Sequence, residues 1–445
     1  MLVSIVFDND YKLIPKENCI LVSVQCNKLT THSTQEKVQE SINELNELMT
    51  TLDMTVKSEF IQTKNQIEPG TIIGTGKLKE ITEFAKENKV NLLVFDLELT
   101  AGQIQKIKKL TNISVIDRCQ VILEIFAKHA RTKESKIQIE ISRLKYLLPR
   151  LMGFWTHFSR QRGGVGVRGG EGEQQIELDR RIIRKRISVL EKELKEVINS
   201  REQQGKRRKN TVMSAALVGY TNVGKSSLMN RLCYGEVLEE NKLFATLDST
   251  FRTLSPNTKP PLVLIDTVGF LNNLPNTLIE GFKTTLESAR EADLLIIVCD
   301  ISSKYYDTQI DVTKSVLTDL KIDEKETIIV FNKTDLNTDP FLPKILKRKY
   351  KNSFFVSSFN EREMDTLREK IINIILDKLD HYDLFLPYKD GEGHSKLLNN
   401  TNIINTSNHE TGIFYRVRTP KFVFERLNLK PYLLLPGHQY ENGLE

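Results

Sequence analysis

The fold of this chain is decided by the stretch Gly219-Tyr220-Thr221-Asn222-Val223-Gly224-Lys225-Ser226. It fits the pattern G-x-x-x-x-G-K-[ST] of a phosphate-binding loop, or P-loop. An apolar run at 213–218 precedes it and predicts a buried strand, and 227–232 has the pattern of a helix. Glycines let successive N–H groups point at phosphate oxygens, and the helix N-terminus adds positive potential. A chance match in a glycine-rich turn would not explain both flanking elements.

Two side chains of the P-loop have predicted roles in nucleotide chemistry. Lys225 would reach the β- and γ-phosphates, and the Ser226 hydroxyl would be a ligand of Mg²⁺. Asn222 could help to coordinate a monovalent cation, K⁺, near the phosphates, or it could merely cap the loop. The loop therefore predicts binding of a Mg²⁺–nucleotide complex.

A second motif follows the apolar run 262–265, which predicts another strand. It reads Asp266-Thr267-Val268-Gly269 and fits D-x-x-G. Asp266 can hold Mg²⁺ through water, and the Gly269 N–H can contact the γ-phosphate. We therefore expect both residues at the phosphate end of the site.

A third motif, Asn332-Lys333-Thr334-Asp335, follows the predicted strand 326–331 and fits N-K-x-D. The Asp335 carboxylate can accept hydrogen bonds from guanine N1–H and its amino group, a donor pair that adenine lacks. If ATP bound instead, a carboxylate buried in such a site would be left without hydrogen-bond donors, so the site should discriminate strongly in favour of GTP. Asn332 and Lys333 would brace the loop and the face of the base. After the run 354–356, backbone N–H groups of Ser357-Ser358-Phe359 could contact guanine O6. These motifs, in this order, indicate a GTPase.

The switch region should lie between the first two motifs, at Phe244-Ala245-Thr246-Leu247-Asp248. A GTPase keeps a threonine here that ligates Mg²⁺ and senses the γ-phosphate. Thr246 and Thr250 are both candidates, and either could be an ordinary loop residue. Phe270 follows the D-x-x-G motif, where many small GTPases have the Gln that orients the attacking water. An apolar side chain cannot do this, so we expect slow intrinsic hydrolysis that needs a partner.

The chain before the P-loop has two further parts. Residues 1–130 alternate between strand and helix patterns, which predicts a small parallel α/β domain. Residues 131–203 carry two apolar seams with a seven-residue repeat, which predict an antiparallel helical hairpin, or arm, kinked at Pro149. The predicted tip is a glycine-rich loop at 160–172. Arg160, Arg162 and Arg168 are candidate RNA contacts there, although a disordered linker would have the same composition.

The remaining parts are a linker at 204–212, the P-loop GTPase domain at 213–380, and a small α+β C-terminal domain at 381–445. The predicted fold class is therefore α/β: a GTPase domain preceded by a small parallel α/β domain and an antiparallel helical hairpin.

Composition excludes several classes of protein. Of the 445 residues, 39% are hydrophobic and 27% charged, which is typical of soluble globular proteins. No apolar stretch approaches the ~20 residues of a membrane span, so we expect no membrane insertion. The five cysteines lack metal-ligand spacing and are expected to be reduced thiols in a cytoplasmic protein. The net charge is only +6, but residues 131–170 contain nine Lys or Arg against two Glu, which favours an anionic partner.

Together these motifs resemble the HflX-type ribosome-associated GTPases. The resemblance covers roughly residues 19–425. Outside the GTPase motifs it is carried by Ile116-Asp117-Arg118, Tyr146-Leu147-Leu148-Pro149-Arg150-Leu151, Ser159-Arg160-Gln161 and Asp179-Arg180-Arg181. It departs from the family pattern at Arg168-Gly169-Gly170-Glu171-Gly172-Glu173, where Arg-Gly-Pro-Gly-Glu is common. It departs again at Ser249 and Phe251, where Pro and Thr are common.

The resemblance implies a monomeric, cytoplasmic GTP hydrolase, partly associated with ribosomes and stimulated by 50S and 70S particles. It implies that the arm approaches rRNA near the peptidyl-transferase region, and that the protein splits or rescues stalled or idle ribosomes. By the family pattern Thr246, rather than Thr250, is the Mg²⁺-linked switch residue. A different hypothesis fits the nucleotide motifs alone: a GTP-dependent regulatory switch whose output is binding of a protein partner.

Overall fold

The computed structural model describes residues 17–151, 170–209, 212–233, 250–271, 288–322 and 325–434. The chain divides into two compact units. One holds the N-terminal sheet and the arm, and the other holds the nucleotide domain and the C-terminal domain. Among the helices of the described ranges, none combines the length and apolar character that crossing a membrane requires.

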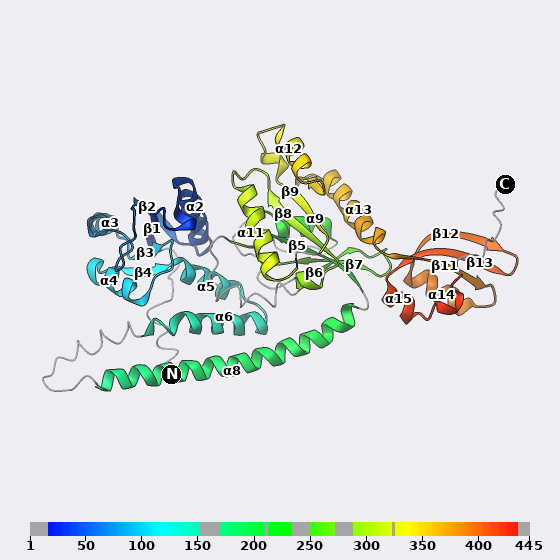
Figure 1. Ribbon diagram of the computed structural model, residues 1–445, viewed down its shortest axis with the longest axis horizontal. Helices are drawn as coiled ribbons and strands as arrows, with labels where there is room; N and C mark the ends of the chain where they lie inside the picture. Colours follow the sequence, from blue (N-terminus) through cyan, green and yellow to red (C-terminus); the bar gives the residue numbers. More distant parts are fainter. Residues whose placement is uncertain are drawn as a thin grey trace. The chain divides into compact units, whose positions relative to one another are not determined.

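The N-terminal domain is built on a four-stranded, fully parallel sheet (Figure 1). In sheet order its strands are β2 (Thr55–Thr63), β1 (Asn18–Gln25), β3 (Leu92–Phe95) and β4 (Ser114–Asp117). Its helices are α2 (Gln35–Thr51), α3 (Thr75–Glu87), α4 (Ala101–Thr111) and α5 (Arg118–His129), with a 3-10 turn η1 (Thr30–His32). The predicted small parallel α/β fold is confirmed.

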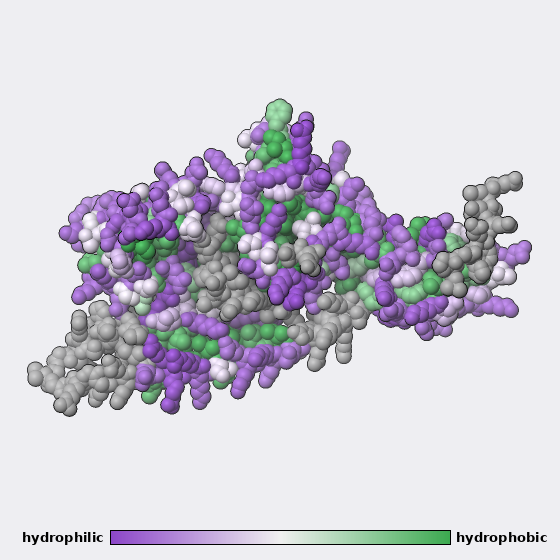
Figure 2. Space-filling view, viewed as in Figure 1, coloured by the Kyte–Doolittle hydropathy of each residue, from purple (hydrophilic) through white to green (hydrophobic). Residues whose placement is uncertain are grey.

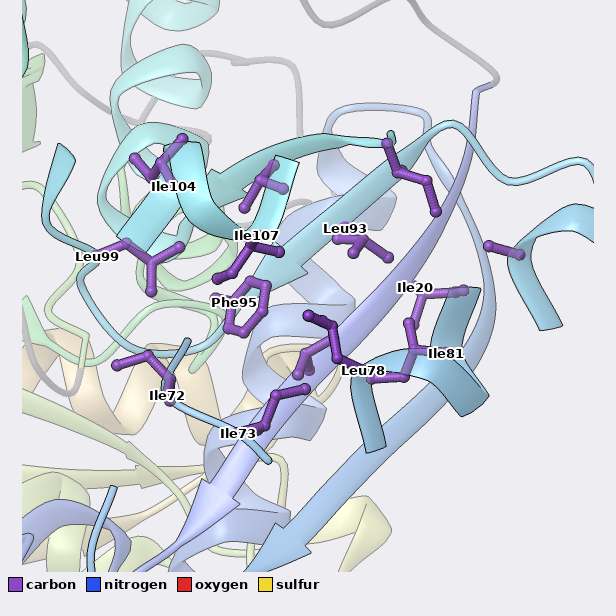
Figure 3. Packing of buried hydrophobic residues seen from close by; sticks show 14 of the residues in the cluster. Ile20, Ile72, Ile73, Leu78, Ile81, Leu93, Phe95, Leu99, Ile104 and Ile107 are labelled. Atoms are coloured by element: carbon purple, nitrogen blue, oxygen red, sulfur yellow. The ribbon is translucent and has the colours of Figure 1, made fainter. Parts of the chain in front are cut away.

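One face of this sheet is covered by α3 and α4, and apolar side chains fill the space between (Figure 3). Ile20 and Phe95 come from the central strands, Ile81 from α3 and Ile107 from α4. All four are essentially inaccessible to solvent. Burial of this size is the main driving force for folding of the domain.

The arm consists of α6 (Lys133–Leu147) and α8 (Gly170–Lys209). Ile137, Ile141 and Leu144 pack against Ile183, Ile187 and Leu190, so the two predicted seams form one core. Ion pairs fix the direction: Lys133 pairs with Glu193 over 2.7 Å, and Glu140 pairs with Arg186 over 2.8 Å. The pair nearer the N-terminus of α6 involves the residue nearer the C-terminus of α8, so the two helices are antiparallel as predicted.

Two details of the arm differ from the sequence expectation. The first helix ends at Leu147 instead of continuing through a kink. Leu148 still has helical dihedrals and its N–H donates to the Leu144 carbonyl over 3.0 Å, but Pro149 has no N–H with which to continue the helix. The second begins at Gly170, inside the expected tip loop, and runs to Lys209, through most of the expected linker. A helix can start at a glycine because the first N–H groups have no partner within the helix.

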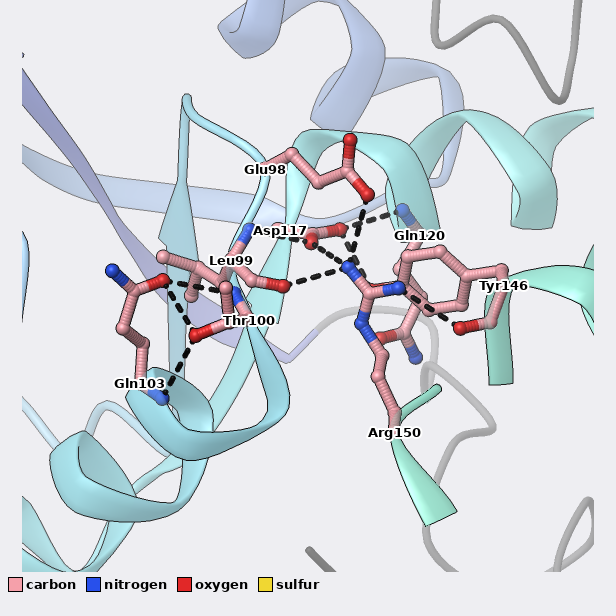
Figure 4. A network of polar contacts seen from close by, with 8 residues as sticks. All are labelled: Glu98, Leu99, Thr100, Gln103, Asp117, Gln120, Tyr146 and Arg150. Carbon is pink, nitrogen blue, oxygen red and sulfur yellow. Dashed lines mark hydrogen bonds and ion pairs between the residues drawn. The ribbon is translucent and has the colours of Figure 1, made fainter. Parts of the chain in front are cut away.

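A buried polar network attaches the arm to the carboxyl edge of the N-terminal sheet (Figure 4). Asp117, fully buried at the end of β4, accepts hydrogen bonds from the Tyr146 hydroxyl (2.8 Å) and from Arg150 Nη2 (3.3 Å). It also accepts from the Leu99 and Gln120 N–H groups, both over 3.0 Å. The Arg150 guanidinium lies over the Tyr146 ring, 3.6 Å from its centroid. Burial raises the pKa of Asp117 although these donors oppose the shift.

A second buried network lies beside the first. Asp96, at the end of β3, accepts from His32 Nε2 (2.8 Å), Arg118 Nη1 (3.0 Å) and the Ser23 hydroxyl (3.2 Å). Arg118 also pairs with Glu44 of α2. Burial alone would raise the pKa of Asp96, but the His32 hydrogen bond and the Arg118 charge lower it to about 2. The network fastens α2 and α5 to the sheet.

The nucleotide domain has a six-stranded sheet in which only β6 is antiparallel to its neighbour. In sheet order its strands are β10 (Ser353–Phe355), β9 (Thr327–Asn332), β8 (Leu294–Asp300), β5 (Met213–Gly219), β7 (Leu262–Asp266) and β6 (Thr250–Ser255). The helices are α9 (Lys225–Leu232), α11 (Tyr306–Asp319), α12 (Leu342–Lys349) and α13 (Glu361–Asp377), with a 3-10 turn η2 (Thr334–Leu336). Because the parallel strands end at one edge, the three predicted nucleotide motifs meet there.

The C-terminal domain is a three-stranded antiparallel sheet with two helices, the predicted α+β class. Its elements are β11 (Asp380–Pro387), α14 (Gly391–Asn400), β12 (Asn402–His409), β13 (Gly412–Thr419), α15 (Lys421–Arg426) and the 3-10 turn η3 (Lys430–Tyr432). Asn402 holds the loop between β6 and β7: its Oδ1 accepts from Lys259 N–H (2.9 Å), and its Nδ2 donates to the Lys259 carbonyl (2.5 Å).

Candidate nucleotide-binding site

The P-loop joins the central strand β5 to α9, and its two glycines have no substitute. Gly219 has φ +147°, and a Cβ there would lie 2.3 Å from the Val298 carbonyl oxygen. Gly224 has φ +90°, and a Cβ there would lie 2.3 Å from Asn332 Nδ2. Both contacts are far below van der Waals distance, and L side chains avoid both conformations. The curled backbone that a phosphate requires is therefore set by these two positions.

Lys225 begins α9 and is buried inside the P-loop. Its Nζ donates to the carbonyl oxygens of Gly219 (3.1 Å) and Tyr220 (2.7 Å). Burial lowers the pKa of Lys225 to about 8, and the negative charge of Asp266 opposes the shift. The protein therefore compensates the positive charge of the ammonium group only weakly. A bound polyphosphate would supply the missing negative charge.

Ser226 and Asp266 bring hard oxygen ligands together at the phosphate end of the site. The Ser226 hydroxyl donates to Asp266 Oδ2 over 2.8 Å, joining α9 to the end of β7. The next residue, Thr267, is buried and donates from its hydroxyl to the Leu217 carbonyl of β5 (2.7 Å). A hydroxyl and a carboxylate are ligands that Mg²⁺ prefers, so this pair fits the ion.

Asn332 ties the N-K-x-D loop to the P-loop. It is fully buried, donates from Nδ2 to the Val223 carbonyl (3.0 Å) and accepts at Oδ1 from the Ser358 N–H (3.2 Å). Lys333 has φ +62° and donates from Nζ to the Asn222 carbonyl (2.8 Å). The predicted phosphate loop, base loop and O6 loop are therefore held in one hydrogen-bonded arrangement.

Asp335 is exposed, and one of its carboxylate oxygens is fixed: Oδ1 accepts from the Ser357 hydroxyl over 2.6 Å. The Ser357 N–H donates to Glu363 Oε2 (2.7 Å), and the Phe359 N–H donates to Ser357 Oγ (3.3 Å). Since these N–H groups and that of Ser358 have protein acceptors, contact with guanine O6 would require an exchange of acceptors. The Phe359 side chain is 75% exposed and lies at the surface of this loop.

Comparison with known proteins places these features in a family. Three family models match in succession: "GTP-binding GTPase N-terminal" at 39–127, "GTP-binding GTPase Middle Region" at 129–208 and "50S ribosome-binding GTPase" at 214–333. The GTPase HflX of Flavobacterium psychrophilum is 38% identical over 380 residues, covering 81% of this chain and 90% of that protein. The chain belongs to the HflX family of GTPases.

A second curated relative agrees. The GTPase HflX of Alkalihalophilus pseudofirmus is 39% identical over 386 residues, covering 86% of this chain and 88% of that protein. A solved structure described as the SsGBP–GDP complex covers 81% of this chain and 99% of that chain, with 25% identity and a TM-score of 0.47. As a member of the HflX family with the P-loop GTPase domain, this chain is a GTP hydrolase that binds GTP and GDP.

Several residues predicted for this HflX-family site lie outside the described ranges. They are Phe244, Ala245, Thr246, Leu247 and Asp248 of the switch and Arg160, Arg162 and Arg168 of the tip loop. Thr250, the other switch candidate, is the first residue of β6 and pairs with Asp266 in the sheet register. Val268 is buried, and Phe270 is 3% exposed. Thr334 opens η2, beside the base loop.

Sequence reasoning missed two acidic residues of this site. Asp300 ends β8 and pairs with Lys333 through Oδ2 over 2.7 Å. Glu363, in the first turn of α13, accepts from the Ser357 N–H and from Asn360 Nδ2 (2.9 Å). A signal for Asp300 was available, because it is the last residue of a strand whose carboxyl end reaches the same sheet edge. Both carboxylates position residues assigned to guanine, and neither belongs to a nucleotide motif.

Proposed function

We propose that this GTPase binds the large ribosomal subunit and the 70S ribosome and couples GTP binding and hydrolysis to splitting or rescue of stalled or idle ribosomes. The observation that carries the proposal is the match of residues 214–333 to the 50S ribosome-binding GTPase family, in a chain with the HflX family's N-terminal and middle regions. The protein would act as a monomer in the cytoplasm, partly associated with ribosomes.

The nucleotide would bind across the carboxyl edge of the six-stranded sheet. Backbone N–H groups of the P-loop and the Lys225 ammonium would hold the β- and γ-phosphates. Ser226 and Thr246 would be the direct protein ligands of Mg²⁺, with Asp266 acting through water; when bound, the ion would neutralise phosphate charge. The Gly269 N–H would face the γ-phosphate, and Asp335 would select guanine. Asn222 is the proposed contributor to a K⁺ site.

Hydrolysis is expected to be slow until the ribosome is engaged. Phe270 is apolar and buried, so it cannot orient the attacking water as a glutamine would. The missing positioning group must come from another residue ordered on the ribosome or from the ribosome itself. Hydrolysis would then release the switch loops and end the ribosome-bound state.

The arm is the proposed ribosome-binding element. Its two helices form one apolar core, and Tyr146 and Arg150 attach it to the N-terminal sheet. The arm can therefore move as one body with that sheet. Tip-loop residues Arg160, Arg162 and Arg168 are proposed to contact rRNA phosphates near the peptidyl-transferase region.

The test is the GTPase rate with and without purified 50S and 70S particles, together with sedimentation in a non-hydrolysable GTP analogue. We expect stimulated hydrolysis, co-sedimentation and, from 70S particles, an increase in free subunits. An unchanged rate would exclude ribosome coupling, and stimulation without free subunits would exclude splitting. Removal of 160–172 should abolish stimulation; ribosome binding that survives it would favour a regulatory switch. Equal stimulated rates in K⁺ and Na⁺ would exclude the K⁺ site.

A further inference from the structure

The nucleotide domain carries three exposed apolar residues on α12 and just before it, which we define as the α12 patch: Leu336 at the end of η2, Phe341 directly before α12 and Ile345 on α12. Their side chains are 59%, 66% and 57% exposed. Figure 2 shows apolar surface at the position of α12, bordered by hydrophilic side chains. Contiguous apolar surface that is rimmed by polar groups marks interaction sites in soluble proteins.

The patch is not needed to hold α12 on its own domain. The Ile345 N–H donates to the Phe341 carbonyl over 3.2 Å, so the two residues lie one helical turn apart on one face. Leu346, the next residue, is 1% exposed and anchors the helix to the domain. The helix thus packs against its domain through Leu346 and has a separate apolar side that faces outward.

The segment that carries this patch is rich in positive charge. The segment 336–351 contains Lys344, Lys347, Arg348, Lys349 and Lys351, with Asp339 as its one acidic residue. Asp307 of α11 neutralises Lys349 over 2.6 Å. Across the part of the chain that the structure describes, no carboxylate forms an ion pair with Lys344, Arg348 or Lys351. The negative helix C-terminus accounts for basic residues in the last turn, but Lys344 and Lys351 lie outside that turn.

We propose that the α12 patch and its basic rim form a docking surface for an acidic protein whose contact face has an apolar centre. Protein interfaces have an apolar core and a polar rim, and opposite charge on the partner would match this rim. RNA would use the lysines and could stack a base on Phe341, but the aliphatic Leu336 and Ile345 offer neither a stacking plane nor a hydrogen bond to a base, so the patch as a whole fits an apolar protein surface better.

The partner's location rests on the proposed function, because we place it on the large ribosomal subunit. The patch begins directly after Asp335, so the partner would dock beside the guanine-binding loop. Docking here would leave the phosphate end of the site, at Ser226 and Asp266, free for the nucleotide.

The test uses the full chain with a photo-crosslinking amino acid, p-benzoylphenylalanine, in place of Ile345. A matched control carries it at Glu369, an exposed residue of α13. Each is bound to purified 50S subunits with a non-hydrolysable GTP analogue, irradiated and digested with ribonuclease or protease. We expect position 345 to crosslink to an acidic protein segment, well above the control. Crosslinks to rRNA, crosslinks within the chain itself, or a yield equal to the control would each overturn the proposal.

Variants give an independent readout. Phe341→Ser with Ile345→Ser should weaken 50S binding by about tenfold or more, since truncating central apolar contacts commonly costs this much. Basal GTPase activity and the thermal unfolding midpoint should not change. Leu110→Ser, which changes a leucine of α4 that is 53% exposed, is the control. If the unaltered chain fails to bind 50S subunits, the proposed function fails and this inference with it. If it binds and the double variant binds equally well, only this inference fails.

Discussion

Ser226 donates a hydrogen bond from Oγ to Oδ2 of Asp266 across 2.8 Å. This contact links the last residue of the P-loop to the first residue of the D-x-x-G motif. Since the two motifs follow different strands, the contact fixes their positions relative to each other. It also gathers two oxygen groups of the kind that Mg²⁺ binds.

Ser226→Ala should therefore remove the Mg²⁺ dependence of nucleotide binding. We expect GTP affinity in Mg²⁺ to fall by about tenfold or more, and affinity in EDTA to change little, because only the ion's ligand is lost. Fluorescence titration with a labelled GTP analogue measures both. Ser227→Ala, one residue further along α9, is the control. Equal Mg²⁺ dependence in Ser226→Ala and the unaltered protein would contradict the ligand role.

Asp335→Asn should change the base that the site accepts. An asparagine amide can pair with the carbonyl at position 2 of xanthine but not with both donors of guanine. GTP affinity should fall by about a hundredfold or more relative to XTP. Competition between the two nucleotides measures the ratio, with Asp319→Asn at the exposed end of α11 as control. Retained GTP selectivity would show that Asp335 does not read the base.

Nucleotide affinity should fall as pH rises through about 8. Burial lowers the pKa of Lys225 to about that value, so its ammonium loses its proton between pH 7 and 9. Phosphates favour the protonated form, and each pH unit above the pKa should weaken binding by up to about tenfold. Isothermal titration with GDP measures this. Lys225→Arg keeps its charge, so its affinity should be flat over this range. A flat profile in the unaltered protein would refute the assignment.

Asp96→Asn should destabilise the N-terminal domain at neutral pH by about 3 kcal/mol, because it removes the buried carboxylate that His32 and Arg118 share, although Arg118 keeps its ion pair with Glu44. The folded pKa of Asp96 is lowered to about 2 from an ordinary value of 3.8. Its contribution is therefore present above pH 4 and is lost as pH falls through about 2. Urea denaturation of both proteins should show that the difference between their free energies of unfolding becomes smaller in acid. Asp53→Asn, which removes an exposed ion pair with Lys128, should cost below about 1 kcal/mol. A difference in unfolding free energy that does not change with pH would contradict the proposed role of the Asp96 carboxylate.

The nucleotide motifs were readable because each is a short local stretch after an apolar strand. Strands β5, β7 and β9 were predicted, and the structure places all three in one sheet. The arm was equally predictable, since its seven-residue repeat is long and regular. In both cases local pattern and tertiary packing favour the same structure.

Elements without a strong apolar pattern escaped prediction. The edge strand β2 reads TVKSEFIQT and is fully buried at no position, and β12 reads NIINTSNH and is mostly exposed. Pairing with a neighbouring strand, not hydrophobic periodicity, defines both. Asp300 and Glu363 escaped for a related reason: each acts on a residue that only the fold brings near it.

The attachment of the arm to the N-terminal sheet has a consequence for synthesis of the chain. Asp117 is completely buried, and its partners Tyr146 and Arg150 follow it in the sequence. In a nascent chain that has left the ribosome only as far as residue 130, the Asp117 carboxylate lacks its hydrogen bonds from the Tyr146 hydroxyl and the Arg150 guanidinium. The sheet's carboxyl edge therefore reaches its final form only after the first arm helix has emerged. A shortened protein that ends near residue 130 would remain in this immature state.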